Sequence, residues 1–153
     1  MKVLVWTTIT YGVEGWTLRA EEKKKIQAAE MWCYRRLLNL SWKDKRTNKS
    51  ILNELNIERE LFGQVVKRKL TYFGHMSRNQ NLNLTKTIVQ GKPEGRRGQG
   101  RPKTAFLDNI KEWTGMKSHQ AFQATLDRDR WREIVWEALR AANAHPDDAG
   151  YSK

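Results

Sequence analysis

Apolar residues recur every three or four positions along most of this chain, which is the spacing of one face of an α-helix. The pattern predicts helices over residues 18–40, 59–78 and 106–113, and from about residue 127 onward. A short helix is expected after Thr47, whose hydroxyl can cap the first turn, and Gly115 is expected to end the third long helix. We therefore expect an all-α chain, although the β-branched residues of segment 3–11 would also suit a short strand.

On each main predicted helix the apolar residues form one face, which we expect to be buried. For residues 18–40 this face consists of Ile26, Ala29, Cys33, Leu37 and Leu40. For residues 59–78 it consists of Phe62, Val65, Val66, Leu70, Phe73 and Met76. For the last helix it consists of Trp131, Ile134, Val135, Ala138, Leu139 and Ala142. Lys69 falls within the second face, so its amine must reach solvent or find a partner.

The chain is strongly basic, with 29 Lys and Arg against 17 Asp and Glu in 153 residues, and its formal net charge is +12. Residues 1–103 carry 22 basic and 9 acidic side chains, whereas residues 104–153 carry 7 and 8. A folded domain with this excess is expected to bind a polyanion, and the charge distribution places the binding surface in the first two thirds of the chain.

A segment rich in glycine, proline and basic residues, 91–103, divides the sequence. Its composition disfavours both helix and strand, so it is expected to be a basic linker. The predicted organisation is a small helical bundle over residues 1–90, this linker, a C-terminal helical subdomain over residues 104–143, and a disordered tail over residues 144–153.

Residues that commonly carry catalysis or bind metals are few and scattered. Cys33 is the one cysteine, which excludes an internal disulfide and favours a reducing compartment. The three histidines lack metal-ligand spacing, and no phosphate-loop, Rossmann or GxSxG motif is present. Asp127 and Asp129 stand at a predicted helix start and are expected to cap it, while Asp147 and Asp148 lie in the polar tail. We expect no cofactor, no metal site and no catalytic residue. No apolar run approaches the ~20 residues that span a bilayer, so no membrane association is expected.

The face opposite the apolar residues of segment 59–78 is the first candidate for nucleic-acid binding. It combines cations with neutral hydrogen-bonding groups and lacks any carboxylate, and it consists of Gln64, Lys67, Arg68, Thr71, His75 and Arg78. An ordinary solvated face usually mixes both signs of charge. The absence of acids therefore favours contact with a phosphate backbone.

Two further segments are candidates. The outer face of residues 18–40 combines cations with a tryptophan that either stacks on a base or packs under another helix; it consists of Lys24, Lys25, Trp32, Arg35 and Arg36. The linker offers Arg96, Arg97 and Arg101. Its Gly-Arg-Pro core is similar to that of an AT-hook, although Gln99 replaces the first arginine of the hook.

Five segments together resemble one known family: YGVEGWTL (11–18), EMWCYRRLLNLSWKDKRTN (30–48), RKLTYFGHMSR (68–78), GRPKTAFLDNIKEWTG (100–115) and DRDRWREIV (127–135). In this order and spacing they are similar to the C-terminal region of LINE-type, non-LTR retrotransposon endonuclease–reverse transcriptases. The resemblance runs from about residue 5 to residue 136. Gln99 and Phe106 depart from it, because arginine and tryptophan are common at these positions in the family.

The resemblance implies a thumb-like helical element of an RNA-directed DNA polymerase, which grips an RNA or DNA template–primer duplex in an intracellular and nuclear setting. The endonuclease domain and the palm aspartates of the family have no counterpart here, so the chain is expected to be non-catalytic by itself. Met1, just before the thumb-like region, suggests a truncated or degenerate copy, or a gene model built on one. Without its palm neighbour, the N-terminal segment would leave an apolar patch prone to association, formed by Val3, Leu4, Val5, Trp6 and Ile9.

Two alternatives stay open. The aromatic-rich helices would suit a protein-interaction module in which Trp16, Trp42 or Trp136 is buried against a partner. The second alternative is a decayed reading frame without function.

Overall fold

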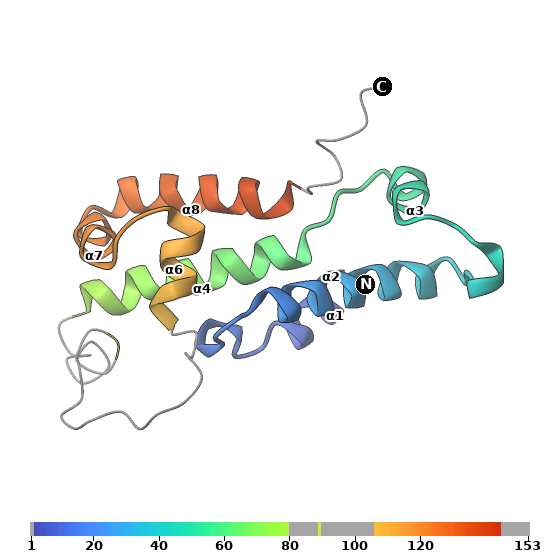
Figure 1. The fold of residues 1–153 in the computed structure, drawn as a ribbon, viewed down its shortest axis with the longest axis horizontal. Coiled ribbons are helices and arrows are strands. Elements are labelled where there is room, and N and C mark those ends of the chain that lie inside the picture. The colour runs from blue at the N-terminus through green and yellow to red at the C-terminus, as the bar shows by residue number, and fades with distance from the viewer. Residues whose placement is uncertain (1, 80–88, 90–105, 145–153) are drawn as a thin grey trace.

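The computed structural model describes residues 2–79, residue 89 and residues 106–144, which form helices joined by turns (Figure 1). The N-terminal part contains α1 (Lys2–Ile9), the 3₁₀ turn η1 (Val13–Gly15), α2 (Ala20–Leu37), the 3₁₀ turn η2 (Trp42–Asp44), α3 (Asn48–Leu55) and α4 (Leu61–Arg78). The C-terminal part contains α6 (Phe106–Thr114), α7 (Ser118–Leu126) and α8 (Arg128–Asn143). No strand occurs among these residues, which confirms the prediction of an all-α fold.

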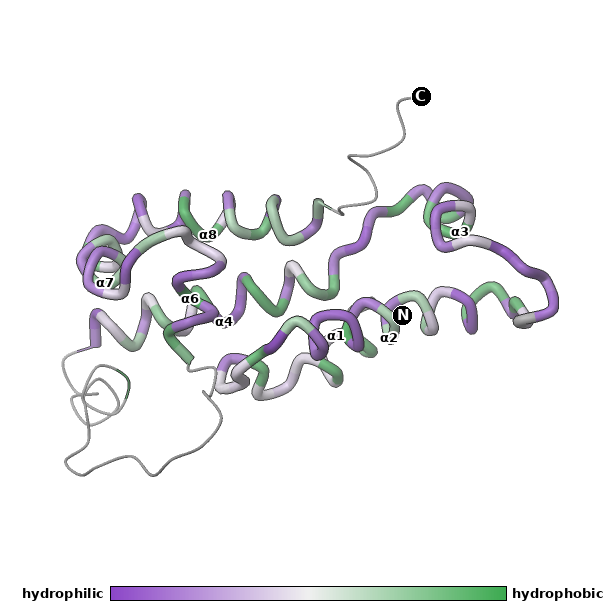
Figure 2. Tube along the Cα trace, viewed as in Figure 1, coloured by the Kyte–Doolittle hydropathy of each residue, from purple (hydrophilic) through white to green (hydrophobic). Residues whose placement is uncertain are grey.

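Helix α4 lies at the centre of the molecule (Figure 1). Helix α8 runs antiparallel beside it, and α6 and α7 lie toward its C-terminal end. Helix α2 also packs against α4 and extends away from it toward α3. Figure 2 shows hydrophobic and hydrophilic positions alternating along α4 and α8, as expected for helices that are buried on one side.

The main apolar cluster combines residues from both sides of the predicted linker. Val13 and Leu18 precede α4, Phe73 lies on it, and Ile110 and Trp131 follow it. The helices that flank the linker therefore share one core. The linker and the last nine residues lie outside the described part of the chain, so the predicted boundaries stay predictions.

The alternative prediction of a short strand over residues 3–11 is wrong, because residues 2–9 form helix α1. The hydroxyls of Thr7 and Thr8 donate to the carbonyl of Leu4, both at 2.9 Å, which makes threonine compatible with the helix. Trp6 is buried: its Nε1 donates to Glu60 Oε1 at 3.2 Å, and its ring packs edge-on against Tyr34 at a centroid distance of 5.9 Å.

The predicted apolar patch at the N-terminus is therefore largely packed. Besides buried Trp6, the side chains of Val5 and Ile9 are half-buried. Leu4 is 77% exposed, and the side chain of Val3 lies outside the described part of the structure.

The buried face of α2 is rotated from the predicted one. It consists of Glu30, Met31, Cys33 and Tyr34, whereas Leu37, which was expected to be buried, is 52% exposed. The reason is a tertiary contact: Glu30 Oε1 accepts hydrogen bonds from the backbone N–H groups of Glu60 (2.8 Å) and Leu61 (3.1 Å). The carboxylate thus caps the start of α4, where free N–H groups favour an anion. The predicted burial of Cys33 is confirmed, and burial together with Glu30 raises the pKa of its thiol.

Three predicted helix ends are confirmed. The Thr47 hydroxyl accepts from the backbone N–H of Ser50 at 3.2 Å at the start of α3. Asp127 caps α8 by accepting from the N–H groups of Asp129 (3.0 Å) and Arg130 (3.1 Å). Gly115 ends α6 with a φ of 66°, a left-handed conformation that glycine adopts without strain.

The amine of Lys69 was expected either to reach solvent or to find a partner, and in the structure it has partners in the core. Its amine is fully buried and donates to the carbonyl of Trp16 and, at 2.8 Å, to Oδ1 of Asn109. It also lies 4.4 Å from the ring centroid of Phe106 and 5.4 Å from that of Trp113. Asn109 in turn holds the backbone of Leu18 through two hydrogen bonds of 2.8 and 2.6 Å.

Two glycines allow α4 and α8 to approach closely. A Cβ at Gly74 would overlap the indole of Trp131, whose Nε1 donates to the Leu70 carbonyl at 3.0 Å. A Cβ at Gly63 would lie 2.8 Å from Cδ1 of Leu139. This packing fixes the outer surfaces of the two helices relative to each other.

Candidate nucleic-acid interface

The outer face of α4 is where the sequence predicts it. Arg68, Thr71 and His75 are exposed. Gln64, Lys67 and Arg78 are half-buried along the same helix. Helix α4 contains no Asp or Glu, so its own side chains place no negative charge on this face.

Helix α8 adds two arginines to this face, Arg128 and Arg132, which the sequence pattern did not indicate. Arg78 extends from the end of α4 and donates from Nη1 to the Thr125 carbonyl at 2.7 Å. Burial, and then the charges of Arg128 and Arg132, lower the pKa of Arg78. The charges of Arg128 and Arg132 therefore act on the Arg78 guanidinium, and the ion pair of Arg132 with Asp129, at 3.1 Å, offsets part of this repulsion.

Aromatic side chains lie among these cations. Lys67 Nζ is 4.6 Å from the ring centroid of Trp136, which is 50% exposed on α8. Tyr72 is exposed one helical turn after Arg68. Arg68 Nη1 donates to the Thr10 carbonyl at 3.1 Å, and the next residue, Tyr11, is exposed.

On α8 the positions of Arg128, Arg132 and Trp136 are spaced by four, so they lie on one flank of the helix. The contact of Lys67 with Trp136, together with the packing of α4 against α8, shows that this flank borders α4. We call the combined surface the α4–α8 face, and define it by Lys67, Arg68, Thr71, Tyr72, His75, Arg78, Arg128, Arg132 and Trp136.

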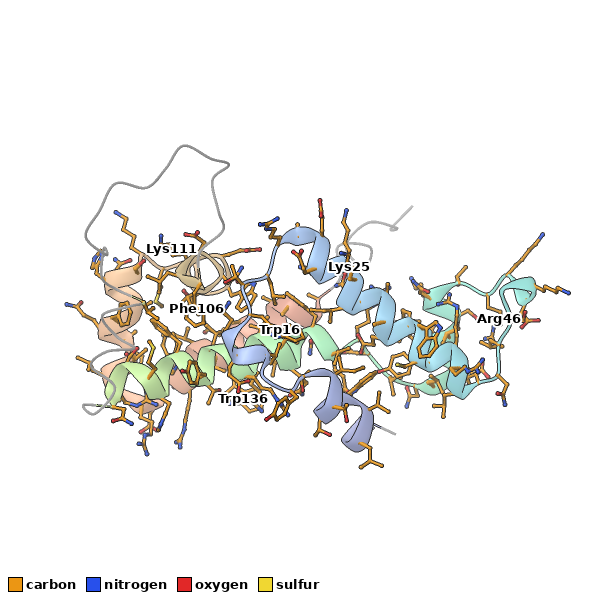
Figure 3. All side chains as sticks on the ribbon, turned by 90° about the horizontal axis from the view of Figure 1, so that it is seen from below. Trp16, Lys25, Arg46, Phe106, Lys111 and Trp136 are labelled. Carbon is orange, nitrogen blue, oxygen red and sulfur yellow. The ribbon has the colours of Figure 1, made fainter. Side chains whose placement is uncertain are left out.

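The second predicted patch, on α2, is separate from this face. Lys24, Lys25 and Arg36 are exposed, and Trp32 is 64% exposed, so no other described helix covers its ring. Figure 3 shows Lys25 and Trp136 on opposite sides of the molecule.

Arg35, predicted as part of the α2 patch, has structural partners. Its Nη2 donates to the carbonyl of Arg46 at 3.2 Å and to Oδ1 of Asn48 at 2.7 Å. Arg35 thereby ties the end of α2 to the segment that leads into α3. The predicted linker residues Arg96, Arg97 and Arg101 lie outside the described part of the chain.

Within the described ranges, no three or more His, Cys, Asp or Glu residues are grouped in a way that could hold a metal ion. No helix in these ranges combines the length and apolar character needed to cross a membrane.

Comparison with protein-family models, with curated proteins and with solved structures finds no match for this chain. The resemblance to LINE-type reverse transcriptases therefore rests on the sequence motifs alone.

Proposed function

We propose that this chain is a helical nucleic-acid-binding module that contacts phosphate groups through the α4–α8 face. The observation that carries the proposal is the packing of α4 against α8, which joins the acid-free outer face of α4 to the flank of α8 that carries Arg128, Arg132 and Trp136. Arg128 and Arg132 repel the charge of Arg78, and a phosphate backbone placed among the three would relieve this repulsion.

Lys67 and Arg68 extend the same surface along α4. Both are held by contacts within the protein, Lys67 by the ring of Trp136 and Arg68 by the carbonyl of Thr10. Side chains that are already ordered lose less conformational entropy when they bind a ligand, which supports their role as phosphate contacts.

The motif resemblance gives the proposal its biological form. In a reverse transcriptase, a thumb-like region binds the nucleic-acid substrate and leaves the chemistry to a palm domain. We accordingly propose that this chain contributes binding and no catalytic step, as a C-terminal fragment of such an enzyme.

A salt titration tests the proposal. Five cations on phosphates, Lys67, Arg68, Arg78, Arg128 and Arg132, predict that the affinity for an oligonucleotide falls roughly 10²–10³-fold between about 50 and about 200 mM salt. Fluorescence anisotropy with a labelled oligonucleotide measures this directly. Absence of binding at low salt, or binding that salt leaves unchanged, would contradict the proposal, and salt-insensitive capture of a protein would favour the interaction module instead.

Charge-matched variants locate the surface. Replacing Lys67 and Arg132 by Gln removes two charges from the α4–α8 face, and replacing Lys24 and Lys25 by Gln removes two from α2. The slope of the logarithm of the binding constant against the logarithm of the salt concentration counts phosphate contacts. We expect the first pair to lower this slope by the equivalent of roughly two contacts and the second pair to leave it nearly unchanged. The reverse result would move the binding surface to α2.

A further inference from the structure

We infer that the α4–α8 face takes an unpaired nucleic-acid strand, with a base stacked on Trp136, in preference to a closed duplex. This inference rests on the proposed function, because it assumes that nucleic acid binds at this face. The cations alone do not distinguish the two ligands, since both present phosphates. The aromatic side chains among the cations do.

Trp136 is the main stacking candidate. Half of its surface is exposed although it lies on the same helix as buried Trp131, Ile134 and Val135. The amine of Lys67 lies over one face of the ring, 4.6 Å from its centroid, and restricts the motion of the indole. A base that stacks on the other face of this partly ordered ring loses less conformational freedom than on a free side chain.

Two tyrosines continue the pattern on the other side of α4. Tyr72 is exposed one turn beyond Arg68. Tyr11 is exposed next to Thr10, whose carbonyl accepts a hydrogen bond from the Arg68 guanidinium. Aromatic rings therefore occur on both flanks of the cationic strip. Such interleaving of stacking surfaces and phosphate contacts is typical of proteins that bind single strands without sequence readout.

The duplex is disfavoured because its bases are not available. Inside a closed duplex every base is paired and stacked on its neighbours, so between the two ends an aromatic ring on a protein surface has no base face to contact. An unpaired strand offers both its phosphates and its bases. The exposed rings on this face therefore add affinity for the single strand alone.

The arginines provide the path for the rest of the strand. Arg132 and Arg128 lie one and two turns before Trp136 on the same flank of α8, about 6 and about 12 Å along the helix axis. A base on Trp136 thus places the neighbouring phosphates beside Arg132 and Arg128, and Arg78 contributes from α4.

The test compares two probes on the full chain at the same low salt: an oligothymidine of about 12 nucleotides and a blunt duplex of the same length. We expect the single strand to bind roughly ten-fold more tightly. Trp136→Leu should weaken single-strand binding by roughly ten-fold and leave duplex binding nearly unchanged. Tyr72→Leu should also weaken single-strand binding, by a smaller factor, and leave duplex binding nearly unchanged.

Trp32→Leu is the matched control, because Trp32 is also exposed and lies on α2, one turn before the exposed Arg36. It should change neither affinity. Equal or tighter binding of the duplex, or equal losses of both probes in Trp136→Leu and Tyr72→Leu, would overturn the inference and leave the proposed function intact. Binding of neither probe at low salt would overturn both.

Discussion

At the scale of single residues, the amine of Lys69 joins three segments of the core. Burial lowers its pKa to about 8, compared with 10.5 for an ordinary lysine. Between these two values the unfolded chain binds more protons than the folded chain, so the Lys69 contribution to the free energy of unfolding increases as the pH rises. Between about pH 7 and about pH 9.5, the Lys69 contribution to the free energy of unfolding increases by about 2 kcal/mol.

Urea denaturation of the wild-type chain and of Lys69→Met over this pH range measures the effect. The Cys33 thiol acts in the opposite direction, because its raised pKa lets the unfolded chain lose the proton first, but it is present in both proteins. The stability difference between the two proteins therefore isolates Lys69, and it should grow in favour of the wild type. A constant difference contradicts the prediction, as would an Nζ titration in the wild type with its midpoint near 10.5.

At the scale of elements, the contact between α4 and α8 depends on glycine at Gly74. Alanine would improve the helix propensity of α4 by about 1 kcal/mol. Its methyl group would nevertheless displace the Trp131 indole and break the hydrogen bond to the Leu70 carbonyl. We expect Gly74→Ala to lower the free energy of unfolding by about 1–3 kcal/mol.

Gly15→Ala is the control for this substitution, because a Cβ there meets no atom within 4 Å. Its effect should stay within about 0.5 kcal/mol of the wild type in the same denaturation experiment. A stabilising Gly74→Ala would mean that α8 does not approach α4 as closely as the structure shows.

The elements also show which parts of the fold a sequence pattern can reveal. The three helices α4, α6 and α8 were predictable because large apolar residues recur along them with the helical period. Helix α7 was missed, since its fully buried apolar residues are the small Ala121 and Ala124. The buried face of α2 was misassigned because the buried carboxylate of Glu30 is stabilised by hydrogen bonds from the N–H groups at the start of α4. A contact between two helices cannot be read from the pattern of one helix.

At the scale of the whole molecule, the shared core makes the two halves of the chain dependent on each other. A fragment ending at residue 90 would keep α4 but lose Ile110, Ala121 and Trp131 from the cluster around Phe73. We expect this fragment to lack a cooperative thermal transition by circular dichroism, because the buried face of α4 would be left in water. Addition of a fragment covering residues 104–153 should restore the transition. Cooperative melting of the first fragment alone would instead support independent domains.

The candidate site has the same dependence on tertiary packing. The cations of α4 were predictable from the helical period and from the absence of acids. Arg128, Arg132 and Trp136 were not, since residues 104–153 carry slightly more acidic than basic side chains and these three stand among acids in the sequence. Their common flank on α8, and its position against α4, become visible once the two helices are packed.

The pairing of Lys67 with Trp136 has a consequence for the lifetime of the protein. The two residues are 69 positions apart and meet when α4 and α8 are packed, so the proposed binding surface exists in the folded chain and is absent from the unfolded one. A ligand that recognises the folded state alone shifts the folding equilibrium toward it by mass action. Under the proposed function, nucleic acid at about one hundred times its dissociation constant would add about 2.7 kcal/mol to the stability of the chain. Occupancy by nucleic acid would then protect the protein from proteases that act on its unfolded form.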